Sequence, residues 1–344
     1  DREFMGGRML AAHLSAPAFY DIVRARSWQY WAMNRARFGV MVAIDGKARF
    51  VFHSQLPHGA RGSIDYARES IALATGREFP YEILGIQEWT AGFTLVAERY
   101  AARRIFLAGD AAHLFTPTAG QGYNTSVDDA VNLGWKLAAV CRGWGGPKLL
   151  ETYETERKPI GHRNTRFARS IADFIGRLDL PEALEENSPA GQAARADLGT
   201  RLHDLARREF DVPGIHFGVH YEGSPIVATE PGDPPIDDPH RYVPHALPGA
   251  RAPHVWLEEG VALYDRFGRE FTLLTLDPSR NTGGLEEAGR ARGAPLAVLR
   301  VNSEEARTLY QSALVLIRPD QHVAWRGDES PEDPGALLDR VIGR

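Results

Sequence analysis

One stretch of the sequence, residues 104–140, limits the fold more than any other. It opens with the apolar run 105–108, which has the length of a buried strand and is stopped by Gly109 and Asp110. A loop follows that holds Pro117. A strand that ends at a carboxylate and passes into a loop before a helix is typical of α/β folds, so we predict a mixed α/β chain built around this stretch.

The loop leads through the glycine pair of residues 120–122 into a predicted helix. We expect this helix to begin near residues 124–126. Its apolar residues recur at steps of three and four, which predicts one continuous packed face made of Val127, Ala130, Val131, Gly134, Leu137, Ala138 and Cys141.

This order of residues can hold a polar, electron-rich ligand. A carboxylate at the position of Asp110 accepts hydrogen bonds from sugar or ribityl hydroxyl groups, although a residue there can equally cap a local turn. Gly120 and Gly122 let the backbone approach a flat ligand, whereas a tight turn is the alternative. The helix N-terminus stabilises negative charge. The fixed succession of these features favours a ligand site over a chance arrangement.

Composition and charge exclude several classes of function. The net charge is −5 and no Lys/Arg run occurs, which argues against a nucleic-acid partner. No apolar stretch approaches the roughly 20 residues that a membrane helix needs. The one cysteine, Cys141, excludes an intrachain disulfide and a Cys-x-x-Cys site, so we expect a cytoplasmic protein. The histidine pairs lack a completing carboxylate or cysteine pattern, so we predict no metal site.

The first third of the chain predicts an antiparallel sheet with strands at residues 28–32, 38–44 and 49–53 and a tight turn at Asp45-Gly46. Phe50 and Phe52 should share one face of this sheet. Val51, His53 and Gln55 should share the other. The sheet is either packed on both faces or forms the wall of an apolar ligand pocket, and both interpretations stay open. In the second case the candidate substrate contacts are Trp31, Met41, His53 and Gln55.

Later segments complete the expected domain plan of residues 1–222, a proline-rich linker at 223–253, and a final domain at 254–344. Residues 254–344 predict a small α/β unit of the thioredoxin kind, without its cysteines, that supports packing or a dimer. The other expected segments are strands at 82–89, 95–100, 271–276, 296–301, 313–317 and 322–325, and helices at 61–75, 148–175 (bent or divided by Pro159), 191–210, from Ser303, and at 331–342.

The segment GDAAHLFTPTAGQGYNTSVDDAVNLGWKLA, residues 109–138, resembles the second flavin motif of the single-component (class A) FAD-dependent aromatic hydroxylases. YETERKP at 153–159 is similar to the helix that follows that motif. PGARAPH at 248–254 resembles the entry to the thioredoxin-like domain of the phenol-hydroxylase branch. The resemblance implies part of an FAD/NAD(P)-binding-type domain with an antiparallel substrate sheet, followed by a thioredoxin-like C-terminal domain.

The resemblance also assigns roles to residues. Asp110 would bind the FAD ribityl chain, with Gly109 allowing close approach. Pro117, the one catalytic candidate, would border the pocket near the flavin carbon that carries the peroxide. Four residues at the start of the helix would contact the isoalloxazine near its N1–O2 edge. These are Gly120, Gln121, Gly122 and Asn124.

The implied reaction is hydroxylation of a small phenolic or polyketide-like aromatic substrate with FAD, NAD(P)H and O2, through a flavin C4a-hydroperoxide. Two alternatives stay open. The first is a flavoenzyme of the same fold that carries out Baeyer–Villiger oxidation or epoxidation. The second is a truncated, non-catalytic scaffold. The implied partners are the aromatic substrate and O2, with no nucleic acid and no membrane, and a homodimer is compatible with the family.

The sequence departs from the family pattern at a few positions. Ala119 stands where glycine is common, and Thr125-Ser126 replaces a common Thr-Gly. The G-x-G-x-x-G motif that holds ADP in this family, and its Asp-Gly motif, do not occur in these residues. We therefore expect that the N-terminal FAD-binding part is missing and that isolated 1–344 purifies without flavin.

Overall fold

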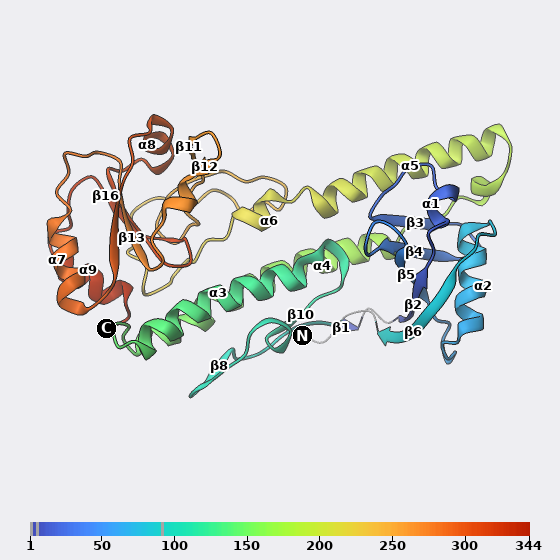
Figure 1. Cartoon of the computed structure of the whole chain (residues 1–344), viewed down its shortest axis with the longest axis horizontal. Helices are drawn as coiled ribbons and strands as arrows, with labels where there is room; N and C mark the ends of the chain where they lie inside the picture. Colours follow the sequence, from blue (N-terminus) through green and yellow to red (C-terminus); the bar gives the residue numbers. More distant parts are fainter. Residues whose placement is uncertain (1–2, 5–6, 91–92) are drawn as a thin grey trace. The chain divides into compact units, whose positions relative to one another are not determined.

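The computed structural model describes residues 3–4, 7–90 and 93–344 (Figure 1). The contacts within the chain divide it into two units. Unit 1 consists of Asp1–Thr94 and Ser170–Arg207, and unit 2 of Leu95–Arg169 and Arg208–Arg344. Each unit is therefore built from two separate segments. The domain plan of 1–222, 223–253 and 254–344 stays a prediction.

Unit 1 is built on a five-stranded antiparallel sheet in the order β3-β4-β5-β2-β6. The turn between β4 and β5 forms where Asp45-Gly46 predicted it. Asp45 Oδ1 accepts three backbone N–H bonds of 2.9 Å, and Gly46 has φ +65°. The strands are β2 Arg8–Ser15, β3 Gln29–Met33, β4 Phe38–Ala43, β5 Arg49–Gln55 and β6 Glu82–Thr90.

Helix α2 (Ile64–Thr75) packs on one face of this sheet. It begins three residues later than expected because Ser63 caps it, accepting the Tyr66 N–H at 3.0 Å. Phe50 and Phe52 point to the α2 face and are 1% and 2% exposed, which confirms the predicted alternation along β5. The short elements α1 (Phe19–Ile22) and η3 (Glu182–Glu185) complete unit 1 together with parts of two long helices.

Those two helices are α4 (Lys148–Gly176) and α5 (Pro189–Phe210), which agree with the predicted ranges within two residues at each end. We expected Pro159 to bend α4 or to divide it in two. The division was wrong, because a single helix runs through this position. Pro159 lies on the exposed side of the helix. A short helix, α6 (Pro213–Phe217), follows in unit 2.

In unit 2 the predicted buried strand at 105–108 was wrong. The strand β9 covers only Ile105–Phe106 and pairs with β8 (Ala101–Ala102) in a small hairpin, with Ile105 69% exposed. Arg103, at φ +57°, turns the chain between the two strands. The strand expected at 95–100 is also shorter, because β7 is Phe93–Val96, and its last two residues pair with β10 (His113–Leu114).

Helix α3 (Gln121–Cys141) begins three residues before the predicted start, and its predicted apolar face was also wrong. Val127 and Val131 are 42% and 49% exposed, and Cys141 is exposed as well. The buried side chains instead include three that can ionise or hydrogen-bond, since the helix turns polar groups toward α4. These are Asp129, Asn132 and Lys136, each 0% exposed.

The C-terminal part of unit 2 contains a four-stranded sheet in the order β14-β13-β15-β16, with only β13 and β14 parallel. This arrangement confirms the predicted mixed α/β character. One helix, α7 (Gly283–Arg292), was not expected from the sequence. The other elements are β11 Trp256–Glu258, β12 Val261–Ala262, β13 Phe271–Thr275, β14 Leu296–Arg300, α8 Glu304–Tyr310, β15 Leu314–Ile317, β16 Val323–Gly327 and α9 Pro334–Val341.

The proline-rich segment 223–253 contains no helix or regular strand in the described chain and consists of turns, isolated bridges and irregular backbone. A search of the described residues finds no helix with both the length and the apolar character needed to cross a bilayer.

Candidate functional site

The predicted strand-end carboxylate, Asp110, lies in a single 3-10 turn, Gly109–Ala111. Gly109 has φ +60°, and a Cβ placed there would lie 2.9 Å from the Ser126 hydroxyl oxygen. Only glycine fits this position, because both the backbone conformation and the closeness of α3 exclude a side chain. Asp110 itself is exposed, so its carboxylate remains available to a ligand.

A second carboxylate, Asp129, holds this turn in place from α3. Its Oδ2 accepts the Gly109 N–H at 3.1 Å and lies 2.6 Å from His113 Nε2. Its Oδ1 accepts the Arg157 Nε–H at 2.8 Å. Burial acts to raise the pKa of Asp129, but the His113 hydrogen bond and the Arg157 charge outweigh it, and the pKa is held below its ordinary value. The turn is therefore fixed by an ionised, fully buried group.

The loop between the turn and α3 is also anchored at two points. The Thr118 hydroxyl donates to the Ala168 carbonyl at 2.7 Å, and the Ala119 N–H donates to Glu209 Oε1 at 2.9 Å. Burial raises the pKa of Glu209. Ala119 has φ +61°, in the left-handed region that glycine adopts most readily. Pro117 is exposed at the edge of the loop.

At the N-terminus of α3, Gly120 has φ +60°, and no side chain of the described residues caps the helix. The Gln121 amide is buried and donates to the Ala119 carbonyl at 3.1 Å. Asn124 is exposed and donates to the Gly120 carbonyl at 2.9 Å. Gly122 leaves the backbone of the first turn bare. The helix therefore presents uncapped N–H groups of its first turn, which favour negative charge.

The structure thus brings the predicted cofactor residues together, because the Gly109 turn packs against Ser126 in the second turn of α3. An exposed carboxylate, a glycine where a Cβ would collide, and an uncapped helix N-terminus fit a cofactor with a hydroxyl-bearing chain and an electron-rich ring edge. Gln121 differs from the others, since its side chain turns into the protein. Sequence reasoning missed Asp129 because it falls on the side of α3 that was expected to be polar and exposed.

The predicted substrate residues lie in unit 1 and fall on two faces of the sheet. Trp31 and His53 are both in register with Val40, so they share a face, and Gln55 lies two residues further along β5 on that same face. Met41 is in register with Phe52, is 3% exposed and packs on the α2 side. The structure therefore groups three of the four candidates and separates Met41 from them.

The face with His53 also carries a residue that sequence reasoning did not select, Trp89 of β6. The two rings meet edge to face with centroids 5.7 Å apart. Burial, together with His13, lowers the pKa of His53, so the imidazole is neutral at ordinary pH. Trp31 makes a similar contact with Phe38 at 6.1 Å. This face is an aromatic wall with a few polar groups, a composition typical of a pocket for an apolar ligand.

A further buried network in unit 2 is centred on Glu156 of α4. Its carboxylate accepts bonds of 2.6 Å and 2.8 Å from the Arg318 guanidinium and one of 2.6 Å from Lys136 Nζ. It also accepts bonds from the Asn132 amide at 2.7 Å and the Ser224 hydroxyl at 2.6 Å. All of these side chains are buried, so the network joins α3 and α4 to the turn after β15 without contact with solvent.

Arg318 has a second carboxylate partner, Asp320, whose oxygens lie 2.9 Å and 2.6 Å from its Nε and Nη2 atoms. Trp135 Nε1–H donates to Asp320 as well, at 3.1 Å. Burial acts to raise the pKa of Glu156, but Arg318 and Lys136 outweigh it and lower that pKa. Burial lowers the pKa of Lys136 to about 8 despite Glu156. Among the described residues, no cluster of histidine, cysteine or carboxylate side chains could hold a metal ion.

Comparison with known families places two models on the chain. The FAD binding domain model matches residues 3–168, and the model described as aromatic-ring hydroxylase, C-terminal, matches residues 245–344.

Named relatives and solved structures agree with these matches. The FAD-dependent monooxygenase opdD of Penicillium oxalicum is 33% identical over 85% of this chain and 59% of its own length. The 4-methyl-5-nitrocatechol 5-monooxygenase of a Burkholderia species is 35% identical over 80% and 49%. The rebeccamycin biosynthetic enzyme RebC with reduced flavin is 35% identical with a TM-score of 0.89, over 100% of this chain and 64% of that one. The chain thus spans about half to two thirds of the length of these proteins.

Proposed function

Because the chain belongs to the class A FAD-dependent aromatic hydroxylases, we propose that the protein uses FAD, NAD(P)H and O2 to hydroxylate a phenolic or polyketide-like aromatic substrate. One observation carries this proposal. The exposed Asp110 is presented beside the uncapped N-terminus of α3 by a glycine turn that the buried Asp129 holds in place.

In this proposal the chain supplies the ribityl and pyrimidine half of the flavin site. Asp110 accepts hydrogen bonds from ribityl hydroxyl groups, and Gly109 leaves room for the chain that carries them. The bare backbone at Gly120 and Gly122 meets the pyrimidine edge, where the α3 dipole stabilises negative charge. FAD, when bound, supplies the reduction of O2 with electrons taken from NAD(P)H.

The substrate would contact the aromatic wall of unit 1. Trp31, His53 and Gln55 share that face, and Trp89 extends it. Aromatic side chains bury a planar ring, and the neutral His53 and the Gln55 amide offer hydrogen bonds to a phenolic hydroxyl without placing a charge in the pocket. Met41 is left out of this set because it belongs to the core under α2. The homodimer and the cytoplasmic location stay predictions.

The proposal is tested with the whole protein that carries these residues. FAD affinity is measured by flavin fluorescence, and substrate-stimulated NAD(P)H oxidation is measured across a panel of phenols and polyketides. We expect Asp110→Ala to weaken FAD binding about tenfold, since it removes a charged hydrogen-bond acceptor. Asp128→Ala, an exposed carboxylate in the second turn of α3, is the control and should bind FAD normally.

Two results would count against the proposal. Equal FAD affinity for Asp110→Ala and the unchanged protein would remove the assigned role of Asp110. A protein with bound FAD whose NAD(P)H oxidation no phenol or polyketide stimulates would contradict hydroxylation. Product analysis separates the remaining alternative, because an inserted ring oxygen or an epoxide would identify Baeyer–Villiger or epoxidising chemistry.

A further inference from the structure

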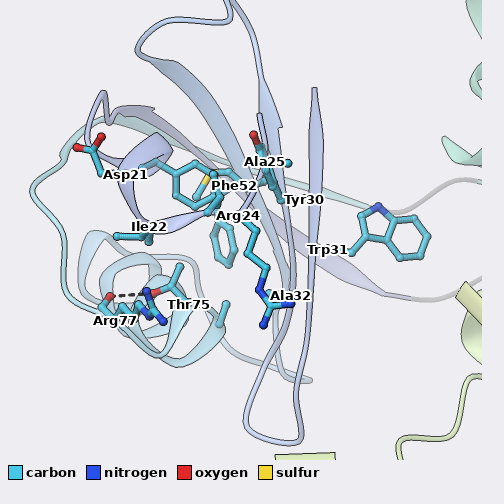
Figure 2. A pocket seen from close by; sticks show the side chains of 14 residues that line it. Asp21, Ile22, Arg24, Ala25, Tyr30, Trp31, Ala32, Phe52, Thr75 and Arg77 are labelled. Atoms are coloured by element: carbon cyan, nitrogen blue, oxygen red, sulfur yellow. Dashed lines mark hydrogen bonds between the residues drawn. The ribbon is translucent and has the colours of Figure 1, made fainter. Parts of the chain in front are cut away.

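We propose that unit 1 carries a second ligand site, for a planar aromatic carboxylate, in a cavity on the α2 side of its sheet (Figure 2). The cavity has a volume of about 620 Å³ and lies between the sheet, the segment 19–25 and the end of α2. It opens on the side of Met41 and Phe52, so it is separate from the aromatic wall that carries His53 and Gln55.

The floor of the cavity is apolar and largely aromatic. Phe19, Met41 and Phe52 are between 2% and 4% exposed, and the half-buried Tyr30 and Ala32 extend the floor along β3. Figure 2 shows Trp31 on the other side of β3, apart from the remaining labelled side chains. A floor of this kind buries a flat ring system, and the volume is in the range of small-molecule sites.

The rim of the cavity is positively charged. Arg24 and Arg77 line it, and neither guanidinium has an ion-pair or hydrogen-bond partner among the described residues. Asp21 is the one acidic residue in the lining, and Figure 2 places its carboxylate well away from both guanidinium groups. The lining therefore has an excess of positive charge and two donors that match a carboxylate in geometry.

The backbone that carries these arginines is held in place by contacts within unit 1. The Ser27 N–H donates to the Tyr30 hydroxyl at 2.6 Å, which anchors the loop after Arg24 to β3. Phe19 packs edge to face against Tyr30 with ring centroids 5.0 Å apart. Arg77 directly follows the left-handed Gly76 that ends α2. The floor and the backbone that carries the rim are thus preformed, and only the two arginine side chains would have to be ordered on binding.

Floor and rim together select one class of ligand. A ring system of two fused aromatic rings would cover the floor, and a carboxylate at its edge would reach the arginines. An inorganic anion would leave the floor unused, and an aromatic amine would meet two positive charges. The site is distinct from the flavin site, because no residue assigned to the flavin lies in its lining. Of the proposed substrate contacts it includes only Trp31, whose side chain lies on the other side of β3.

The probe is 2-naphthoate, titrated into the chain by isothermal calorimetry, with methyl 2-naphthoate as its uncharged counterpart. We expect 2-naphthoate to bind with a Kd of about 0.1–1 mM. Arg24→Gln and Arg77→Gln should each weaken binding about threefold, and the double variant about tenfold, because each removes an exposed charge. The affinity for the ester should not change in any of these variants.

Arg26→Gln is the matched control. It removes the same charge from the same loop, but Arg26 packs over the Tyr20 ring, with its Cζ 4.6 Å from the ring centroid, and does not line the cavity. Ala32→Phe, which fills the floor, should abolish binding while circular dichroism shows an intact fold. Gln55→Ala, on the opposite face, should leave the affinity for 2-naphthoate unchanged.

The proposal is overturned if 2-naphthoate gives no heat of binding up to about 10 mM, if the ester binds equally well, or if the double arginine variant binds like the unchanged chain. Loss of binding in Gln55→Ala, with retention in Ala32→Phe, would place the ligand on the other face and would equally overturn it. None of these results bears on FAD affinity, which is measured separately.

Discussion

Asp129 connects three parts of unit 2 through one carboxylate: the Gly109 turn, the His113 ring and the Arg157 guanidinium. Two of these partners are charged or can become charged, and all lie away from solvent. A buried ion pair contributes little net stability relative to an apolar pair, but breaking it leaves a charge buried without a partner. The position of the Gly109 turn therefore depends on this residue remaining ionised.

Asp129→Asn should lower the free energy of unfolding by about 3 kcal/mol, because Arg157 would stay buried without its counter-charge. The measurement is urea-induced unfolding. Asp128→Asn is the matched control: its side chain is 56% exposed and lies 3.8 Å from the same guanidinium, so its loss should cost less than about 0.5 kcal/mol. Equal costs for these adjacent substitutions would contradict the assigned role.

Lys136 makes the stability of the protein depend on pH in the alkaline range. Burial lowers its pKa from 10.5 to about 8. Between pH 8 and 10.5 the unfolded chain binds the proton and the folded chain does not, so this residue makes the protein more stable as the pH rises through that window. Below pH 8 both states are protonated and its contribution is constant.

The test compares the unfolding free energy of the unchanged protein and of Lys136→Met from pH 7 to 9.5, so that titrating tyrosines cancel in the difference. The difference should change in favour of the unchanged protein as the pH rises above 8. A difference that stays constant across this range would show that Lys136 titrates as it does in water.

At the scale of whole elements, α3 shows where sequence reasoning succeeded and where it failed. The existence of the helix followed from the spacing of its apolar residues, but the buried face did not. Val127 and Val131 have the right spacing for a core, yet ion pairs to α4 turn the opposite side inward. Apolar periodicity cannot detect a face whose burial is stabilised by charges on another helix.

Two other elements show the same limit of local patterns. The run 105–108 is apolar enough for a buried strand, but its partner is only two residues long, so Ile105 stays exposed. Helix α7 was missed because three of its ten residues are glycine. By contrast, the β4–β5 hairpin and the helix start at Ser303 depend on local chemistry, and those signals were sufficient.

Pro159 weakens α4, since it cannot donate a hydrogen bond to the carbonyl four residues earlier. The residue is exposed, so Pro159→Ala leaves no cavity. We expect this substitution to raise the free energy of unfolding by about 1–3 kcal/mol in thermal or urea unfolding. Pro334→Ala is the control, because proline at the start of α9 costs the helix nothing, and its effect should stay within about 0.5 kcal/mol.

No gain in Pro159→Ala would mean that the helix already compensates for the missing bond at this position. The prediction would then be wrong, because nothing else in the environment of the residue favours proline.

Within unit 2 as a whole, Arg318 is the link between the C-terminal sheet and helices α3 and α4. The sequence predicted only a turn at residues 318–321, and the turn is present between β15 and β16. Its charged residues could not be assigned from the sequence, because their partners Glu156 and Trp135 are more than 160 residues away. The same two parts also share a core that includes Trp135, Trp144 and Phe271.

Arg318→Met should lower the free energy of unfolding by about 3–5 kcal/mol, because two buried carboxylates lose their main counter-charge. Arg280→Met, whose partners Asp277 and Glu329 are exposed, should cost less than about 1 kcal/mol. Urea unfolding of both variants gives the comparison. If Arg318→Met were as mild as the control, the network would not connect the two parts energetically.

Because unit 1 is made of two separate segments, it cannot be completed until the second segment has been synthesised. Its sheet is encoded by residues up to 94, but it also needs residues 170–207, which supply contacts such as the Arg35 N–H bond of 2.7 Å to Glu185. A ribosome that adds about 5–20 residues per second takes about 6–23 s to make the stretch from 95 to 207. During that interval the strands of the sheet have been synthesised, but the contacts from residues 170–207 have not yet formed. Unit 1 therefore reaches its full set of contacts only after residue 207 has been synthesised.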